Sequence, residues 1–235
     1  MLVVRPVHVL KLRLVKMQEA RPGFWVPDRT SWGWIFKGGP EALANLDRVE
    51  HSIEACGVRL RTAIDGGAFV GSWTLRLATS FKRVVAYEPI PENFDCLERN
   101  VTCQPSIAEK VDLCRCALTD RIGPMERVRP DRKAYGQQVR HVARPPSGGS
   151  VWAEMQGITI DSTGVEDVDL IKLDLEGHEY EALMGAQNTI AKYRPVIMIE
   201  EKHDPEKRAT AFLKKLGMVC NWSRKYDFLY TWPVK

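Results

Sequence analysis

From Thr62 onward, short apolar runs alternate with segments of helical spacing, and this alternation limits the possible folds more than any other feature. Strands are predicted at 62–65, 84–88, 111–116, 169–174 and 195–200, and helices at 72–81, 91–101, 178–193 and 205–216. Strands that alternate with helices at this spacing form a parallel sheet with helices on both faces. Two further runs, 218–222 and 227–232, are expected to pair as an antiparallel C-terminal edge. The sequence therefore predicts an α/β fold.

The composition is that of one globular unit. The chain has 235 residues, 44% of them hydrophobic, which is enough for a single core. Charged residues interrupt the apolar N-terminal segment, so we expect neither a membrane span of roughly 18 apolar residues nor a secretory signal. The six cysteines form no C-x-x-C pair and predict reduced thiols rather than a zinc site. These features predict a cytoplasmic protein, and its net charge of +4 allows an anionic partner without requiring nucleic acid.

Residues 1–60 are predicted to form an N-terminal extension that packs on a core domain of residues 61–235. Alternation in Val3–Met17 predicts a strand, and spacing after Pro40 predicts a helix that ends at Gly57. Between them lies a tryptophan-rich loop with short strand. We expect Trp25, Trp32 and Trp34 to pack the extension onto the core, although a stacking platform for a sugar or base is the alternative.

One long interval, 123–150, interrupts the core domain and is predicted to be a loop. It contains four prolines and four glycines. It also carries six basic residues, namely Arg127, Arg129, Arg132, Lys133, Arg140 and Arg144. Two interpretations stay open: a lid that recognises phosphate, or a solvated disordered loop.

The segment Asp65–Gly71 joins the first core strand to its helix and reads Asp-Gly-Gly-Ala-Phe-Val-Gly. Glycines there permit a tight turn and a close approach of a ligand to the backbone. Glu88 ends the next strand, where an acid accepts hydrogen bonds from ribose hydroxyls in nucleotide-binding α/β folds. The segment predicts an adenosyl cofactor, with a tight turn without a ligand as the alternative.

Two details favour a methyl donor over a dinucleotide. Asp65 directly precedes the glycines, where a carboxylate can hold the cationic amino-acid portion of S-adenosylmethionine (SAM). The glycines at 66, 67 and 71 do not follow the G-x-G-x-x-G spacing of dinucleotide-binding loops.

The sequence resembles the FkbM family of methyltransferases from about Thr62 to Glu200. The resemblance rests on Ile64–Gly71, Tyr87–Phe94, Ala117–Asp120 and Thr159–Ser162, and above all on Asp169–Glu179 with Leu183–Ala186. It implies a class I methyltransferase Rossmann-like fold and O-methylation of sugars or natural products. Asn usually stands in the family where this chain has Phe69.

The resemblance also implies a set of cofactor-binding residues. Those of the loop would shape the methionine pocket, Glu88 would bind ribose, and a short segment would flank the adenine. The set consists of Asp65, Gly66, Gly67, Ala68, Phe69, Gly71, Glu88, Pro89, Asn93, Ala117, Leu118 and Asp174.

Candidate catalytic residues follow the predicted strand 169–174, because sites in open α/β sheets lie at the carboxyl ends of strands. They are Asp174, Glu176 and His178, followed by Glu179. His178 is the preferred general base for a hydroxyl acceptor, and the alternative is a solvated residue of the first helical turn. A second hypothesis joins Asp174 and Glu176 with Glu200 or His203 as ligands of a divalent metal ion.

The predicted function is O-methylation, by SAM, of a hydroxyl on a glycan or related small molecule that can carry phosphate. A nucleic-acid methyltransferase, using the basic interval and the tryptophans, is the first alternative. A cofactor-binding protein without catalysis, or a dinucleotide oxidoreductase, is the second.

Overall fold

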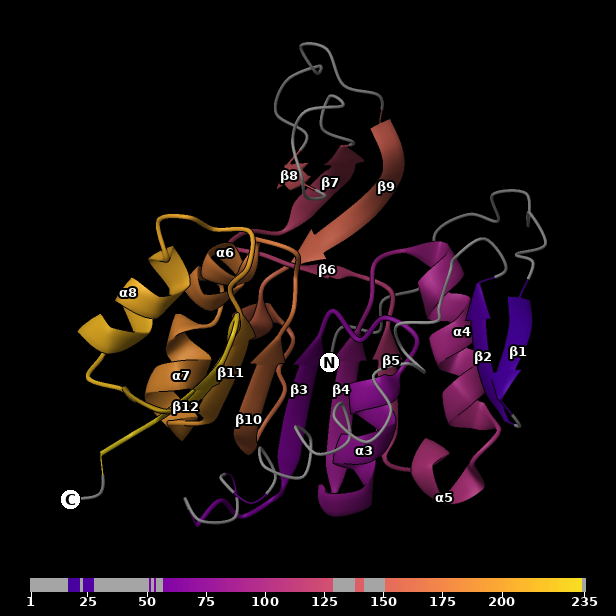
Figure 1. Cartoon of the computed structure of the whole chain (residues 1–235), viewed down its shortest axis with the longest axis horizontal. Helices are drawn as coiled ribbons and strands as arrows, with labels where there is room; N and C mark the ends of the chain where they lie inside the picture. Colours follow the sequence, from indigo (N-terminus) through magenta and orange to yellow (C-terminus); the bar gives the residue numbers. More distant parts are fainter. Residues whose placement is uncertain are drawn as a thin grey trace.

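The structure is a computed structural model that describes residues 17–21, 23–27, 51, 53, 57–128, 138–141 and 151–233. Its centre is a seven-stranded sheet (Figure 1). The strands lie in the order β12 (Val219–Arg224), β13 (Asp227–Thr231), β11 (Val196–Glu200), β10 (Val168–Leu173), β3 (Thr62–Gly66), β4 (Arg83–Tyr87) and β5 (Val111–Cys114). The five strands from β11 to β5 are parallel, and β13 is antiparallel to β11 and β12. The predicted fold class, including the antiparallel edge, is confirmed.

Helices cover both faces of this sheet. Successive side chains of a strand point to opposite faces, and β4 shows both environments. Val84 packs with α3 (Ser72–Ser80) and Ala86 with α4 (Pro91–Thr102). Val85 lies in the core cluster of the opposite face, with side chains from α6 (Glu179–Met184), α7 (Gln187–Tyr193) and α8 (Arg208–Lys215). A short helix, α5 (Pro105–Ala108), leads into β5.

The prediction of one continuous helix over 178–193 is wrong, because the structure has two helices there, α6 and α7, separated at Gly185 and Ala186. A Cβ on Gly185 would lie 2.0 Å from the carbonyl oxygen of Thr119, so the chain of β6 passes against this break. The Asp161 carboxylate then accepts the backbone N–H groups of Asn188 and Thr189 and caps α7. Contacts from distant segments therefore divide a helix that is continuous by local pattern.

The prediction of a loop over 123–150 is also wrong for the described residues. They contribute β7 (Gly123–Val128) and β8 (Gln138–His141) to a second sheet, in the order β6 (Ala117–Leu118), β9 (Val151–Ile158), β7 and β8. The predicted strand 111–116 accordingly ends at Cys114, and β6 begins a new direction. This sheet stands over the upper edge of the central sheet, where β3 and β10 end (Figure 1). Residues 129–137 and 142–150, with most of the basic side chains, lie outside the described part, as do the side chains of Arg127 and Arg140.

The N-terminal residues that the structure describes form a hairpin of β1 (Met17–Arg21) and β2 (Phe24–Pro27) beside α4. The Arg99 guanidinium lies 3.4 Å from the centre of the Trp25 ring, so Trp25 packs on the core as expected. Trp32, Trp34 and most of the predicted strand and helix of residues 1–60 lie outside the described residues. Among the helices of the described part, none has both the length and the apolar character that crossing a membrane requires.

Candidate functional site

The predicted cofactor loop lies where β3, β4 and β10 end side by side. Gly67 and Ala68 donate backbone hydrogen bonds to the Tyr87 carbonyl at 2.9 and 3.0 Å. Gly67 has φ 74°, and a Cβ there would lie 1.9 Å from the Asp174 carbonyl oxygen at the end of β10. The close approach of a neighbouring strand therefore requires this glycine.

The other loop residues also pack against the protein. A Cβ on Gly66 would lie 2.9 Å from side-chain atoms of Leu118 and Leu173, and one on Gly71 would lie 2.9 Å from Leu97. The Ala68 side chain is buried in the α4 cluster. These contacts set the shape of the loop, and its contact with a cofactor stays a prediction.

Glu88 is fixed at the end of β4 by three N–H groups. Its carboxylate accepts hydrogen bonds from the Phe69 N–H at 3.0 Å, the Ile90 N–H at 2.9 Å and the Asn93 side-chain amide at 3.2 Å. Pro89 is half-buried between these contacts. The structure thus brings together three residues of the predicted cofactor set, Phe69, Glu88 and Asn93, and it holds the acid in one orientation.

Asp65 does not have the surroundings that we expected. It is fully buried, accepts a hydrogen bond from the Thr74 hydroxyl at 2.7 Å and lies 3.0 Å from the Lys172 ammonium. The prediction that this carboxylate holds the cationic end of the cofactor is therefore corrected, because a cation of the protein itself already neutralises it.

Lys172 lies in the candidate site but was not predicted from the sequence. It lies opposite Asp65 in the register of β10 and β3, and its side chain is 3% exposed. Burial opposes its charge, but the carboxylates of Asp65 and Asp174 outweigh burial and raise the pKa of Lys172. The available signal was a lysine inside the apolar run Asp169–Leu173, since a lysine is almost never fully buried without a partner.

Asp174, Glu200 and Asp227 form an acidic group at the ends of β10, β11 and β13. Asp174 lies 4.0 Å from the Lys172 ammonium, and Glu200 faces Asp227 in the register of β11 and β13. Burial, and then the charge and hydrogen bonding of Asp174, raise the pKa of Glu200 to about 8. Glu200 therefore keeps its proton near neutral pH and can donate it in a hydrogen bond to Asp174. Asp227 was also missed, and burial raises its pKa.

The predicted metal ligands do not form one set. Glu176 pairs with the His203 ring at 3.0 Å, whereas Asp174 interacts with Glu200. Within the residues that the structure describes, no group of three or more His, Cys, Asp or Glu side chains is arranged to hold a metal ion.

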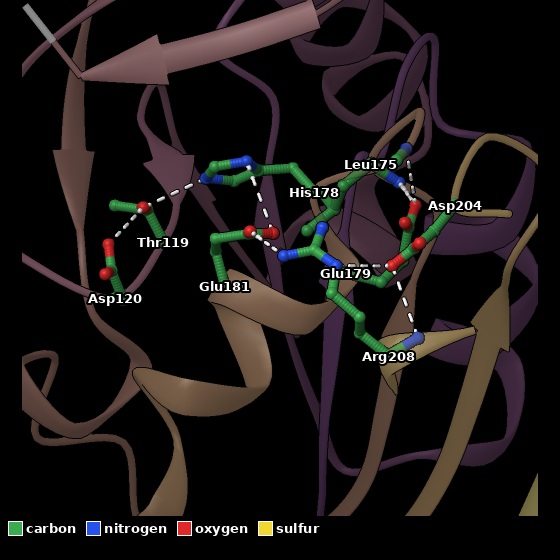
Figure 2. A network of polar contacts seen from close by, with 9 residues as sticks. Thr119, Asp120, Leu175, His178, Glu179, Glu181, Asp204 and Arg208 are labelled. Carbon is green, nitrogen blue, oxygen red and sulfur yellow. Dashed lines mark hydrogen bonds and ion pairs between the residues drawn. The ribbon is translucent and has the colours of Figure 1, made fainter. Parts of the chain in front are cut away.

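His178 lies at the start of α6 and belongs to a chain of polar contacts (Figure 2). Its Nε2 atom lies 3.0 Å from the Thr119 hydroxyl, and its Nδ1 atom lies 3.6 Å from the Glu181 carboxylate. The Thr119 hydroxyl donates to Asp120 at 3.1 Å. With the Thr119 hydroxyl donating to Asp120, the tautomer of His178 that carries its hydrogen on Nε2 completes the chain, and Nδ1 is then the basic atom of the neutral ring.

Arg208 closes this chain of contacts on the side of α8. It donates to Glu181 at 2.7 Å and to Asp204 at 2.9 Å (Figure 2). The His178 side chain is 12% exposed. His178 is thus held between two elements, and the interpretation as a freely solvated first-turn residue is not what the structure shows.

Glu179 shapes the turn that leads into α6. Its buried carboxylate accepts hydrogen bonds from the backbone N–H groups of Leu175 at 2.7 Å and Gly177 at 3.2 Å (Figure 2). Burial raises the pKa of Glu179 to about 7, although these hydrogen bonds oppose the shift. Its contacts assign this residue to the turn between Asp174 and His178.

The residues present fit a cationic, ribose-containing group. SAM carries a sulfonium and an ammonium, and Asp174, Glu200 and Asp227 supply acidic groups on that edge, beside the cations Lys172 and Arg224. Ala117 packs in a cluster with Ile90, two residues after Glu88, whereas the Leu118 side chain lies in the core. Contact of these two residues with an adenine stays a prediction.

Comparisons with known proteins bear on the family and the fold of the chain. The chain matches the model of the methyltransferase FkbM domain over residues 65–230. It is 24% identical to methyltransferase sdnD of Sordaria araneosa, over 52% of this chain and 59% of that protein. The crystal structure of methyltransferase FkbM from Methylobacillus flagellatus KT superposes with a TM-score of 0.53 at 19% identity, over 74% of this chain and 44% of that one.

The superposition on this crystal structure shows that the two proteins share the class I methyltransferase fold. This chain spans about half the length of the relatives that it matches.

Proposed function

The chain belongs to the FkbM methyltransferase family, and we propose that it transfers the methyl group of SAM to a hydroxyl of a glycan or related small molecule. One observation carries the cofactor part of this proposal. The Phe69 N–H of the glycine loop and the Asn93 amide hold the Glu88 carboxylate at the end of β4, where class I folds place an acid for ribose.

The edge of the sheet supports the methyl-transfer part. SAM supplies a methyl group that is already activated by its sulfonium, so the protein mainly aligns the acceptor and excludes water. The acceptor oxygen forms its bond to the methyl carbon while the carbon–sulfur bond breaks, and sulfur keeps the electron pair. The hydroxyl proton must then go to a base.

We assign that proton to His178 at Nδ1. The Thr119 hydroxyl occupies Nε2, and the Glu181 carboxylate, 3.6 Å from Nδ1, would stabilise the imidazolium that forms. Asp174 and Glu176, which were predicted beside His178, have other partners: Asp174 interacts with Glu200, and Glu176 pairs with His203. Asp174 would then face the cationic donor rather than act as the base.

A methyl-transfer screen tests the proposal. Labelled SAM would be incubated with the protein and with panels of glycans, small hydroxyl compounds and RNA. We expect transfer to a hydroxyl in the first two panels, with the ether product identified by mass spectrometry. Transfer only to RNA, with salt-dependent binding, would contradict the acceptor class and support the nucleic-acid alternative.

The role of His178 is tested with the accepted compound. His178→Ala should lower turnover at least about tenfold, since general-base catalysis contributes factors of this size or larger. Affinity for S-adenosylhomocysteine (SAH), measured by calorimetry, should stay within about twofold of wild type. Spared turnover with lost SAH affinity would show that His178 is not the base.

A further inference from the structure

The hairpin of β1 and β2 contacts the cofactor loop as well as α4. Val70, in the middle of the loop, lies in one buried cluster with Phe24 and Val26 of the hairpin and Cys96 of α4. Phe69 packs against the same cluster from the loop side. Residues far apart in sequence thus share one small core directly behind the loop.

Asn100 of α4 connects the two segments with hydrogen bonds. Its side chain is fully buried. The amide oxygen accepts from the Trp25 N–H at 2.6 Å. The amide nitrogen donates to the Trp25 carbonyl at 2.9 Å and to the Val70 carbonyl at 2.7 Å. One side chain therefore joins the hairpin backbone to the loop backbone.

The loop needs such support, because it holds an unfavourable backbone conformation next to Glu88. Phe69 has φ 55°, in the left-handed region that a residue with a bulky side chain rarely adopts. In that conformation its N–H reaches Glu88 at 3.0 Å. Packing of the Phe69 ring on the hairpin cluster and fixation of the Val70 carbonyl both favour this conformation over the alternatives.

We propose that the hairpin of β1 and β2 is a clamp that holds the cofactor loop in its binding conformation before the cofactor binds. Asn100 is the positioning residue that links the hairpin to the loop. This inference rests on the proposed binding of SAM by the loop. Asn100 acts through Val70 and Phe69 on the orientation of Glu88. A loop held in its binding geometry loses less conformational entropy when the cofactor binds, which raises affinity.

Three variants of the full chain test the clamp. Asn100→Asp keeps the acceptor for the Trp25 N–H but places an oxygen against the carbonyls of Trp25 and Val70. Phe24→Ala weakens the cluster from the hairpin side. Glu98→Ala is the matched control, because Glu98 lies two residues before Asn100 on α4 and its side chain is exposed.

SAH affinity is measured by calorimetry at a temperature where each variant is folded. Hydrogen exchange of the amides of residues 67–71 is measured without ligand. We expect Asn100→Asp and Phe24→Ala each to weaken SAH binding about tenfold and to speed exchange in the loop, while Glu98→Ala stays within about twofold of wild type. If Asn100→Asp does not fold, Phe24→Ala decides on the same readouts.

Unchanged affinity and exchange in Asn100→Asp and Phe24→Ala would overturn the clamp, as would an equal loss in Glu98→Ala. Both results presuppose a wild type that binds SAH. A wild type that does not bind SAH would instead overturn the proposed function, and the clamp with it.

Discussion

The two halves of the site, the glycine loop with Glu88 and the surroundings of His178, are held in different ways. In the first half, the backbone N–H groups of Gly67 and Ala68 bond to the Tyr87 carbonyl, and that of Phe69 bonds to the Glu88 carboxylate. In the second half, side chains from β6, α6 and α8 meet around one imidazole. A short stretch of sequence therefore supplies the contacts around Glu88, although distant segments support the loop from behind, whereas the contacts around His178 come from separate elements of the fold.

The largest effect should come from the loop half. Gly67→Ala would place a Cβ 1.9 Å from the Asp174 carbonyl oxygen at a φ of 74°. Left-handed strain and overpacking together should lower the free energy of unfolding by about 4 kcal/mol or more. Chemical denaturation measures this value.

Gly164→Ala is the matched control for that change. Gly164 has φ 68°, and a Cβ there would meet no atom within 4 Å. It should cost only the left-handed strain, about 1 kcal/mol. Equal losses in the two variants would show that close approach to β10 does not matter.

Next in size is the buried pair beneath the loop. Lys172→Met leaves the Asp65 carboxylate buried with Thr74, and should cost about 3 kcal/mol. Adding Asp65→Asn should recover part of this loss. The exposed pair of Arg83 and Asp112 is the control, since Arg83→Met should cost less than about 1 kcal/mol by denaturation. A loss of stability in Lys172→Met as small as that in Arg83→Met would show that burial does not increase the cost of breaking this ion pair.

The turn before His178 should show a pH effect. The pKa of Glu179 is raised to about 7 in the folded protein, above its ordinary value of 4.5. Its contribution to stability is therefore full below pH 4.5 and lost as the pH rises through about 7. Glu179→Gln keeps an acceptor for the Leu175 N–H and should remove about 2 kcal/mol of the stability difference between pH 5 and pH 8. The exposed Glu206→Gln should leave that difference unchanged, and a matching change there would refute the assignment.

The smallest effect on stability should come from Thr119. Thr119→Val removes the partner of His178 Nε2 and should cost about 1 kcal/mol. Turnover of an accepted compound should nevertheless fall about tenfold, since His178 loses its fixed tautomer. Thr163→Val removes a hydroxyl that bonds to the Ile160 carbonyl, the Val165 N–H and the Tyr87 hydroxyl rather than to His178. It should cost as much stability and leave turnover unchanged, so equal turnover in both variants would exclude the contact with His178.

The same contrast explains what could be predicted from sequence. The glycine loop, the position of Glu88 after a strand and the alternation of strands with helices are local patterns, and the structure agrees with them. The pairing of Asp65 with Lys172 spans more than a hundred residues, and it reverses the role expected of Asp65.

Other corrections have the same origin. The helix break at Gly185 follows from the approach of Thr119, and the second sheet pairs Gly123–Val128 with Val151–Ile158 across a segment rich in proline and glycine. The spacing of apolar residues within one segment cannot predict contacts with a distant segment. His178 was found as a candidate because it follows a buried strand, but its partner Thr119, and Arg208, which holds its second partner Glu181, come from elsewhere in the chain.

Calorimetry of the wild type with SAH and with NAD, side by side with Glu88→Ala, tests the central claim most directly. The account predicts that SAH binds, that NAD does not, and that loss of the Glu88 carboxylate weakens SAH at least about tenfold. Preference for NAD, or an SAH affinity that is indifferent to Glu88, would contradict it.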